Sequence, residues 1–113
     1  MHELAITQSM CDLVLEQAKK AGAKKVGKIN LVIGEMTGVV GDCVQFYFDF
    51  ISKGTLAEGA ALSFAMVPPK AQCRDCGKTF EIREFDWTCP DCRGSSLQIV
   101  AGKELFVESI EVE

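Results

Sequence analysis

Four cysteines in two close pairs constrain the fold of this chain more than any other feature. Cys73 and Cys76 enclose two residues, Cys89 and Cys92 enclose two more, and twelve residues separate the pairs. Two residues between cysteines let one tight turn aim both sulfurs at the same point. Two such pairs therefore supply the four thiolates of a closed tetrahedral zinc site. We predict a structural Zn²⁺ held by Cys73, Cys76, Cys89 and Cys92.

The spacing also predicts the subdomain that holds the metal. The segment between the pairs has room for two short strands and a turn but not for a helix, which indicates a zinc ribbon over residues 69–97. Gly77 and Gly94 follow the two pairs, where we expect turns with positive φ. So short a unit cannot fold by apolar burial alone, so zinc binding would contribute its folding free energy, on the order of 10 kcal/mol.

The 113-residue chain is long enough for one globular unit plus this small subdomain. It has no apolar run of 18 residues and no basic-then-apolar start typical of a signal peptide. We therefore expect a cytoplasmic protein with no membrane partner. In that compartment its six cysteines are expected to be thiols or thiolates and not disulfides.

The charge of the ribbon argues against nucleic acid as a partner. The chain has a formal net charge of −4, and four thiolates on one Zn²⁺ would add two negative charges. Acidic side chains in the ribbon match the basic ones in number, namely Asp75, Glu81, Glu84, Asp86 and Asp91 against Lys70, Arg74, Lys78, Arg83 and Arg93. No net basic surface remains to displace counterions from phosphates. We therefore interpret Phe85 and Trp87 as a hydrophobic supplement beside the metal and not as a platform for bases.

Periodic apolar residues predict two helices outside the ribbon. Residues 4–21 form the first, with an apolar face at three- and four-residue steps made by Ile6, Met10, Leu13, Val14, Ala18 and Ala21. Asp42 is expected to cap the second, which ends near Gly54. The stripe of that helix consists of Cys43, Phe46, Tyr47, Phe50 and Ile51, and we expect it to pack against a sheet. Cys11 and Cys43 are both expected in the core.

Alternating residues predict strands at 28–33, 62–66 and 105–113. Pro68 and Pro69 separate the second strand from the ribbon, because proline removes a ladder donor. The register of the last strand stays open, since Phe106 and Ile110 share one parity while Leu105 and Val107 share the other. The expected fold is α+β, with two helices packed on a small three-stranded sheet and an inserted four-cysteine zinc-ribbon subdomain. Residues 1–68 plus 98–113 would form the base domain, and 69–97 the ribbon.

The first three residues have the chemistry of a nickel site. The Met1 amine and the His2 amide nitrogen can close a five-membered chelate ring, and that amide and the His2 imidazole Nδ1 can close a six-membered ring. Three nitrogens in one plane suit Ni²⁺ or Cu²⁺. The fourth ligand stays open between water, a Glu3 group and a residue from elsewhere.

In combination, these motifs resemble the HypA/HybF family of hydrogenase-maturation nickel metallochaperones over the whole chain. The matching segments are Met1-His2-Glu3-Leu4, Ile33-Gly34-Glu35, Phe46-Tyr-Phe-Asp-Phe50, Lys53-Gly54-Thr55, Val67-Pro68, the two cysteine pairs and Ser109-Ile110-Glu111-Val112. The resemblance implies a zinc site at the four cysteines and a nickel site built on His2. It also implies delivery of Ni²⁺ to the immature large subunit of a [NiFe] hydrogenase, with a hydrogenase-maturation GTPase as partner. Some members of the family also serve urease, and some have a further histidine near the ribbon, which this chain lacks.

Two other classes of function remain open at this point. Paired CxxC motifs also hold iron in rubredoxin-like electron carriers, and a plain zinc-ribbon adaptor would bind a protein with no role for His2. Catalysis is disfavoured, since His2 is the single histidine and the chain has no GxxxxGK[ST] phosphate loop. We therefore expect a carrier and not an enzyme.

Overall fold

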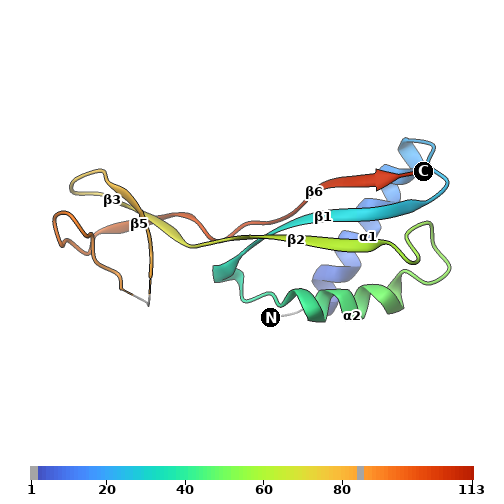
Figure 1. The fold of residues 1–113 in the computed structure, drawn as a ribbon, viewed down its shortest axis with the longest axis horizontal. Helices are drawn as coiled ribbons and strands as arrows, with labels where there is room; N and C mark the ends of the chain where they lie inside the picture. The colour runs from blue at the N-terminus through green and yellow to red at the C-terminus, as the bar shows by residue number, and fades with distance from the viewer. Residues whose placement is uncertain (1–2, 84–85) are drawn as a thin grey trace.

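The computed structural model describes residues 3–83 and 86–113. Its element order is α1 (Glu3–Lys20), β1 (Val26–Gly34), the 3₁₀ helix η1 (Glu35–Thr37), α2 (Gly41–Ile51), β2 (Ala61–Val67), β3 (Lys70–Cys73), β4 (Thr79–Glu81), β5 (Leu97–Ala101) and β6 (Leu105–Val112). The molecule is elongated, 55 × 25 × 17 Å. Both helices lie at one end and the cysteine-bearing sheet at the other (Figure 1). The predicted combination of two helices, a three-stranded sheet and a four-cysteine ribbon is confirmed.

The base sheet has the order β2-β1-β6, with β1 parallel to β2 and antiparallel to β6. A parallel pair needs a crossover connection, and α2 provides it between β1 and β2. The core lies between this sheet and the two helices, and its largest fully buried side chains include Phe48, Ile29, Ile33 and Val14. Cys11 is 1% exposed, as predicted. Within the described ranges, neither helix has the length and apolarity needed to cross a membrane.

A bulge in β6 explains why the parity of this strand is mixed. Asn30 pairs with Ser109 while the next residue, Leu31, pairs with Val107, so Glu108 is an extra residue. An extra residue reverses the side of the sheet on which later side chains lie. Val107 and Ile110 therefore both pack against the core although they differ in parity.

The buried face of α1 differs from the predicted one at Leu13 and Thr7, and Ala21, which was predicted on that face, is exposed just after the helix ends at Lys20. Met10, Val14 and Ala18 are buried as expected, but Leu13 is 46% exposed. Thr7 is fully buried, and its hydroxyl donates to the Glu3 carbonyl oxygen at 2.6 Å. That bond satisfies the polar atom and lets Thr7 join the core face.

The helix α2 contradicts two predictions. Asp42 is not the N-cap, since the helix begins at Gly41 after Val40 and its N-cap makes no side-chain hydrogen bond. The predicted inward stripe is also wrong at Phe46 and Phe50, which are 70% and 73% exposed, whereas Ile51 packs against the core. Val44 and Phe48 are the buried pair instead. Cys43, predicted in the core, is exposed as well.

The physical reason is that α2 carries two apolar stripes. The base sheet is small, and the core takes up mainly one of them. Val44 and Phe48 lie one turn apart on the side of α2 that joins the core cluster with α1 and β1. Phe46 and Phe50 lie on another side of the same helix and remain on the surface. The predicted end of the helix is close to the observed one, since Gly54 has φ +77 just after Ile51.

Three chain segments meet closely where the base joins the ribbon. A Cβ atom on Gly34 would lie 2.1 Å from the Gly102 carbonyl oxygen, and one on Gly102 would lie 2.7 Å from the Cα of Pro69. Gly102 also has φ +109. The Met36 amide donates to the Gly102 carbonyl oxygen at 2.8 Å. We call this close approach of the three segments the neck. Positions 34 and 102 in the neck have room only for glycine.

The ribbon sheet has the order β4-β3-β5, with both neighbours antiparallel to β3. Its strand β5 reaches Ala101 and therefore takes in residues 98–101, which are predicted to belong to the base. The division into two domains stays a prediction.

Candidate metal centre

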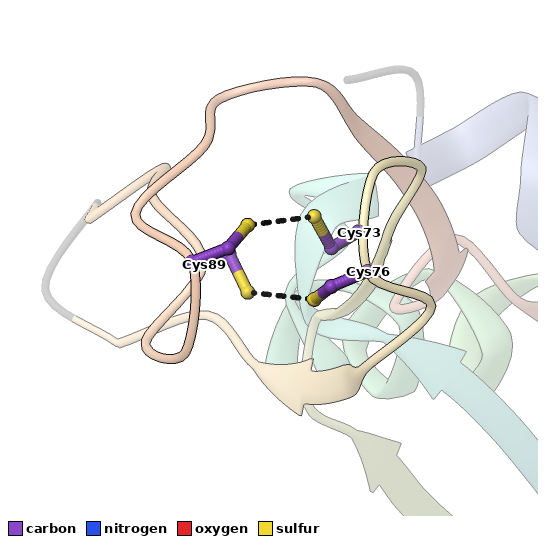
Figure 2. Close-up of side chains that lie close together, drawn as sticks. Cys73, Cys76 and Cys89 are labelled. Atoms are coloured by element: carbon purple, nitrogen blue, oxygen red, sulfur yellow. Dashed lines mark hydrogen bonds between the residues drawn. The ribbon is translucent and has the colours of Figure 1, made fainter.

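The first cysteine pair lies in a tight turn at the end of β3. The Cys73 amide donates to the Lys78 carbonyl oxygen, and the Gly77 amide donates to the Cys73 carbonyl oxygen, both at 2.8 Å. Gly77 has φ +79, as predicted from its place after Cys76. The turn directs both sulfurs toward the second pair (Figure 2).

The second pair uses a similar turn with a different residue in the left-handed region. The Cys89 amide donates to the Gly94 carbonyl oxygen at 2.9 Å, and the Arg93 amide donates to the Cys89 carbonyl oxygen at 2.8 Å. Arg93, and not the predicted Gly94, has the positive φ, at 59°. Gly94 is needed for space, because a Cβ there would lie 2.9 Å from Asp75 Oδ2 and 3.3 Å from Cys92 Sγ.

The four sulfurs converge in a cage of the size that zinc needs. All four Sγ atoms lie within 4.8 Å of one another. The Sγ atoms of Cys73 and Cys92 are 3.5 Å apart, as are those of Cys76 and Cys89 (Figure 2). A tetrahedral Zn²⁺ with bonds of about 2.3 Å has its sulfurs about 3.8 Å apart. The donor set and its spacing therefore fit a structural zinc ion at the predicted residues.

Backbone amides and neighbouring thiols make the four sulfurs electrostatically unequal. Hydrogen bonds from the Cys92 and Asp91 amides lower the pKa of Cys89 to about 7, against the effect of burial. The Gly94 amide favours the Cys92 thiolate, but its contact with Cys73 and burial outweigh that effect and raise the pKa of Cys92 to about 12. Four thiolates so close together repel one another, so a divalent cation is what allows all four to lose their protons.

Other contacts hold the two turns and their sheet together. Lys78 Nζ lies 3.1 Å from Asp91 Oδ1 and so joins the first turn to the second, although both side chains are largely exposed and the pair contributes little. Ala71 and Ile82 are buried in the ribbon. Trp87, predicted as a hydrophobic supplement beside the metal, is 44% exposed, and Phe85 lies outside the described residues.

Of the three predicted nickel ligands, only Glu3 lies among the described residues. Met1 and His2 lie outside the described residues. Glu3 begins α1, and its Oε2 lies 3.4 Å from the amide nitrogen of Val40, the residue before α2. This contact sets the start of α1 against the start of α2, in the base and away from the cysteine cage (Figure 1).

Sequence comparison gives a full-length match to one family. Residues 1–112 match the family described as "Hydrogenase/urease nickel incorporation, metallochaperone, hypA". The chain is 46% identical to the hydrogenase maturation factor HypA of Caldanaerobacter subterraneus subsp. tengcongensis, with all of both chains covered. It is 45% identical to that of Dehalococcoides mccartyi, covering all of this chain and 95% of the relative.

Solved structures agree with this family and with the fold. A solution structure of a HypA protein superposes with a TM-score of 0.78 at 25% identity, covering 100% of this chain and 97% of the other. The solution structure of the Ni metallochaperone HypA from Helicobacter pylori gives a TM-score of 0.69 at 26% identity, covering 99% and 97%. The chain therefore belongs to the HypA family of metallochaperones for nickel incorporation into hydrogenase and urease.

Proposed function

We propose that this chain carries Ni²⁺ and delivers it during maturation of a [NiFe] hydrogenase. The observation that carries the proposal is the match of residues 1–112 to a nickel-incorporation metallochaperone family. A relative at 46% identity along its entire length is a hydrogenase maturation factor. The acceptor would be the immature large subunit of the hydrogenase, with a maturation GTPase as partner in the cytoplasm.

The nickel would be held by nitrogen donors at the start of the chain. The Met1 amine, the His2 amide and the His2 imidazole supply three donors in one plane, and Glu3 or a residue from elsewhere completes the set. A cargo ion must leave again, so few protein ligands suit this role better than a closed cage. Protons compete with nickel for the amine and the imidazole, so nickel affinity is expected to fall as pH falls.

The zinc would have a separate, structural task. Four cysteine thiolates fit a closed site with no open position for a substrate, and such a site contributes folding free energy to a small subdomain. The cage would keep β3 and the two turns in place while the cargo ion binds at the start of the chain. This division of labour fits a carrier and needs no catalytic residue.

Replacing His2 separates this function from the alternatives. His2→Ala is expected to abolish nickel binding while the zinc content and the fold stay unchanged. Gln8→Ala, an exposed change on α1, is the matched control and is expected to keep both metals. An adaptor or an iron-bearing electron carrier would not respond to His2→Ala, and the iron form would be coloured. Equal nickel binding by His2→Ala and Gln8→Ala would therefore overturn the proposal.

A further inference from the structure

An apolar groove lies between α1 and β6, the strand at one edge of the base sheet (Figure 1). Its cavity has a volume of about 370 Å³. We define the α1–β6 groove by its main apolar lining residues, which are Ile6, Met10, Leu13, Leu31, Leu105 and Val107. Leu13 is 46% exposed and Leu105 is 41% exposed, so the walls of the groove present large apolar side chains to water.

The strand β6 is poorly covered on the side of the sheet that carries the helices. No residue of β6 is buried, and only Val107 and Ile110 are half-buried, although their partners Leu31 and Ile29 on β1 are buried. A sheet face that packs on helices is normally covered along all its strands. The helix layer of this chain therefore stops short of β6 and leaves the groove beside α1.

The groove has the length of a short helix. A second cavity of about 380 Å³ continues it along the same two elements and shares Leu13 and Val107 with the first. Together the two cavities have walls made by residues 6–17 of α1 and 105–110 of β6. Each wall is about 16 Å long, which equals about three turns of helix.

The strand wall of the groove is acidic. Residues 104–113 include Glu104, Glu108, Glu111 and Glu113 and no lysine or arginine. Glu108 lines the second cavity and is the extra residue of the β6 bulge. Lys28 lies 3.9 Å from Glu111, and in residues 3–83 and 86–113 Glu108 forms no salt bridge. Glu108 therefore offers a carboxylate for a basic group beside the apolar floor.

The edge of β6 argues against an extended segment as the occupant. Bulges and charged side chains are the features by which edge strands avoid pairing with another strand. The pairing of β6 with β1 has two register shifts, and the exposed Glu108 lies at one of them. A helix that rests in the groove needs no backbone hydrogen bonds from this edge, so the groove suits helix docking better than strand addition.

We propose that the α1–β6 groove binds an amphipathic helix of a partner protein that carries lysine or arginine beside its apolar stripe. The stripe would cover Leu13 and Leu105, and a basic side chain would pair with Glu108. A second copy of this chain does not supply such a helix. The apolar face of α1 is buried in its own core, and α2 has Asp42 and Asp49 and no basic residue. The occupant is therefore a different protein.

Fluorescence polarisation with designed peptides tests the kind of occupant. The probe is a labelled peptide of about four helical turns with a leucine stripe flanked by lysines, added to the zinc-loaded full chain. We expect saturable binding at micromolar concentrations. One control peptide has glutamates in place of the lysines, and another has its leucines at alternate positions as in a strand. Equal binding of all three, no binding of the lysine helix, or preference for the alternating peptide would overturn the proposal.

Two pairs of variants test the place of binding. Glu108→Lys is expected to weaken binding of the lysine helix by about ten-fold and to strengthen binding of the glutamate helix, whereas Glu81→Lys, an equal charge change on exposed β4, is expected to do neither. Leu105→Ser is expected to weaken binding by about ten-fold, and Val100→Ser, at a 47% exposed site on β5, is its control. Circular dichroism and zinc content verify that each variant is folded. Equal effects within both pairs would contradict the site.

Two further measurements distinguish the groove from other surfaces and identify its natural occupant. In NMR spectra, the lysine helix is expected to shift the methyl signals of Leu13 and Leu105, and shifts centred instead on Phe46 and Phe50 would overturn the proposal. In cells that produce this protein, a photo-reactive residue at position 13 should cross-link a basic amphipathic helix of another protein, with little product from position 100. A second copy of this chain, an acidic segment, or equal products from both positions would contradict it.

Discussion

Glu3 and Val40 connect the starts of the two helices, with Glu3 Oε2 3.4 Å from the Val40 amide nitrogen. The contact joins positions 37 residues apart in the sequence. Glu3 is also the first residue of α1, and its carbonyl oxygen accepts the Thr7 hydroxyl. The residue next to the proposed nickel donors is therefore held by the fold of the base.

Glu3→Gln is expected to change nickel binding more than stability. The contact with Val40 is long and exposed, and an acidic residue in the first turn of a helix contributes little, so the unfolding free energy should fall by less than about 1 kcal/mol. Removing the carboxylate should weaken nickel binding if Glu3 supplies the fourth ligand. Urea denaturation and a nickel titration of the same sample check the two effects. Unchanged nickel affinity would assign the fourth ligand elsewhere.

Removal of zinc is expected to unfold the ribbon while the base stays folded. The base core, built around Phe48 and Ile29, is separate from the four cysteines. With a chelator or in Cys89→Ser, NMR signals of Ala71 and Ile82 should lose their dispersion while those of the base core persist. Cys43→Ser is the control, since Cys43 is exposed and outside the cage. Ribbon signals that survive loss of the metal would contradict the structural role of zinc.

Gly34→Ala is expected to destabilise the protein by at least about 2 kcal/mol, because the added methyl group would overlap the Gly102 backbone in the neck. Gly27→Ala on the same strand is the control. A Cβ there would meet its nearest neighbour, the Glu111 carbonyl oxygen, at an ordinary 3.8 Å, so the effect should stay within about 1 kcal/mol. Urea denaturation of the zinc-loaded proteins measures both. Equal effects would show that the neck tolerates a side chain.

Cys11 is expected to make stability fall at alkaline pH. Burial and, second, the Asp12 carboxylate raise the pKa of Cys11 above its usual value. Because the folded pKa is the higher one, the contribution is fully present below the unfolded pKa, about 8.5, and is lost as pH rises through the folded pKa. Urea denaturation between pH 7 and 10 checks this against Cys11→Ala. The stability advantage of the unchanged chain should shrink above about pH 9, and a constant difference would argue against burial of the neutral thiol.

The cysteine cage could be predicted from the sequence because its rule is local. Two residues between cysteines restrict each pair to a tight turn, and four sulfurs then have a single arrangement around a metal. The prediction of positive φ succeeded at Gly77 and failed at Gly94, where Arg93 takes that conformation. The sequence showed that a glycine was needed there. It did not show that the reason was the space beside Asp75 and Cys92.

The orientation of α2 could not be predicted because it depends on the rest of the fold. Periodicity identifies an apolar stripe but not which of two stripes faces the core. Phe46 and Phe50 are larger than Val44, yet Val44 and Phe48 are the buried pair. The same limit applies to β6, where a bulge at Glu108 changes the register and no composition signal marks it. The outward orientation of Phe46 and Phe50 follows from which residues form the core, and periodicity does not contain that information.

Calorimetric titration measures directly whether nitrogen donors at the start of the chain hold nickel. Zinc-loaded protein that begins at Met1 is titrated with Ni²⁺ at neutral pH beside a version with extra residues before Met1. We expect tight, saturable binding to the first and a loss of at least ten-fold in affinity for the second, because the extension removes the Met1 amine from the metal. Equal affinities would exclude the amine, and no binding to either would contradict the carrier function.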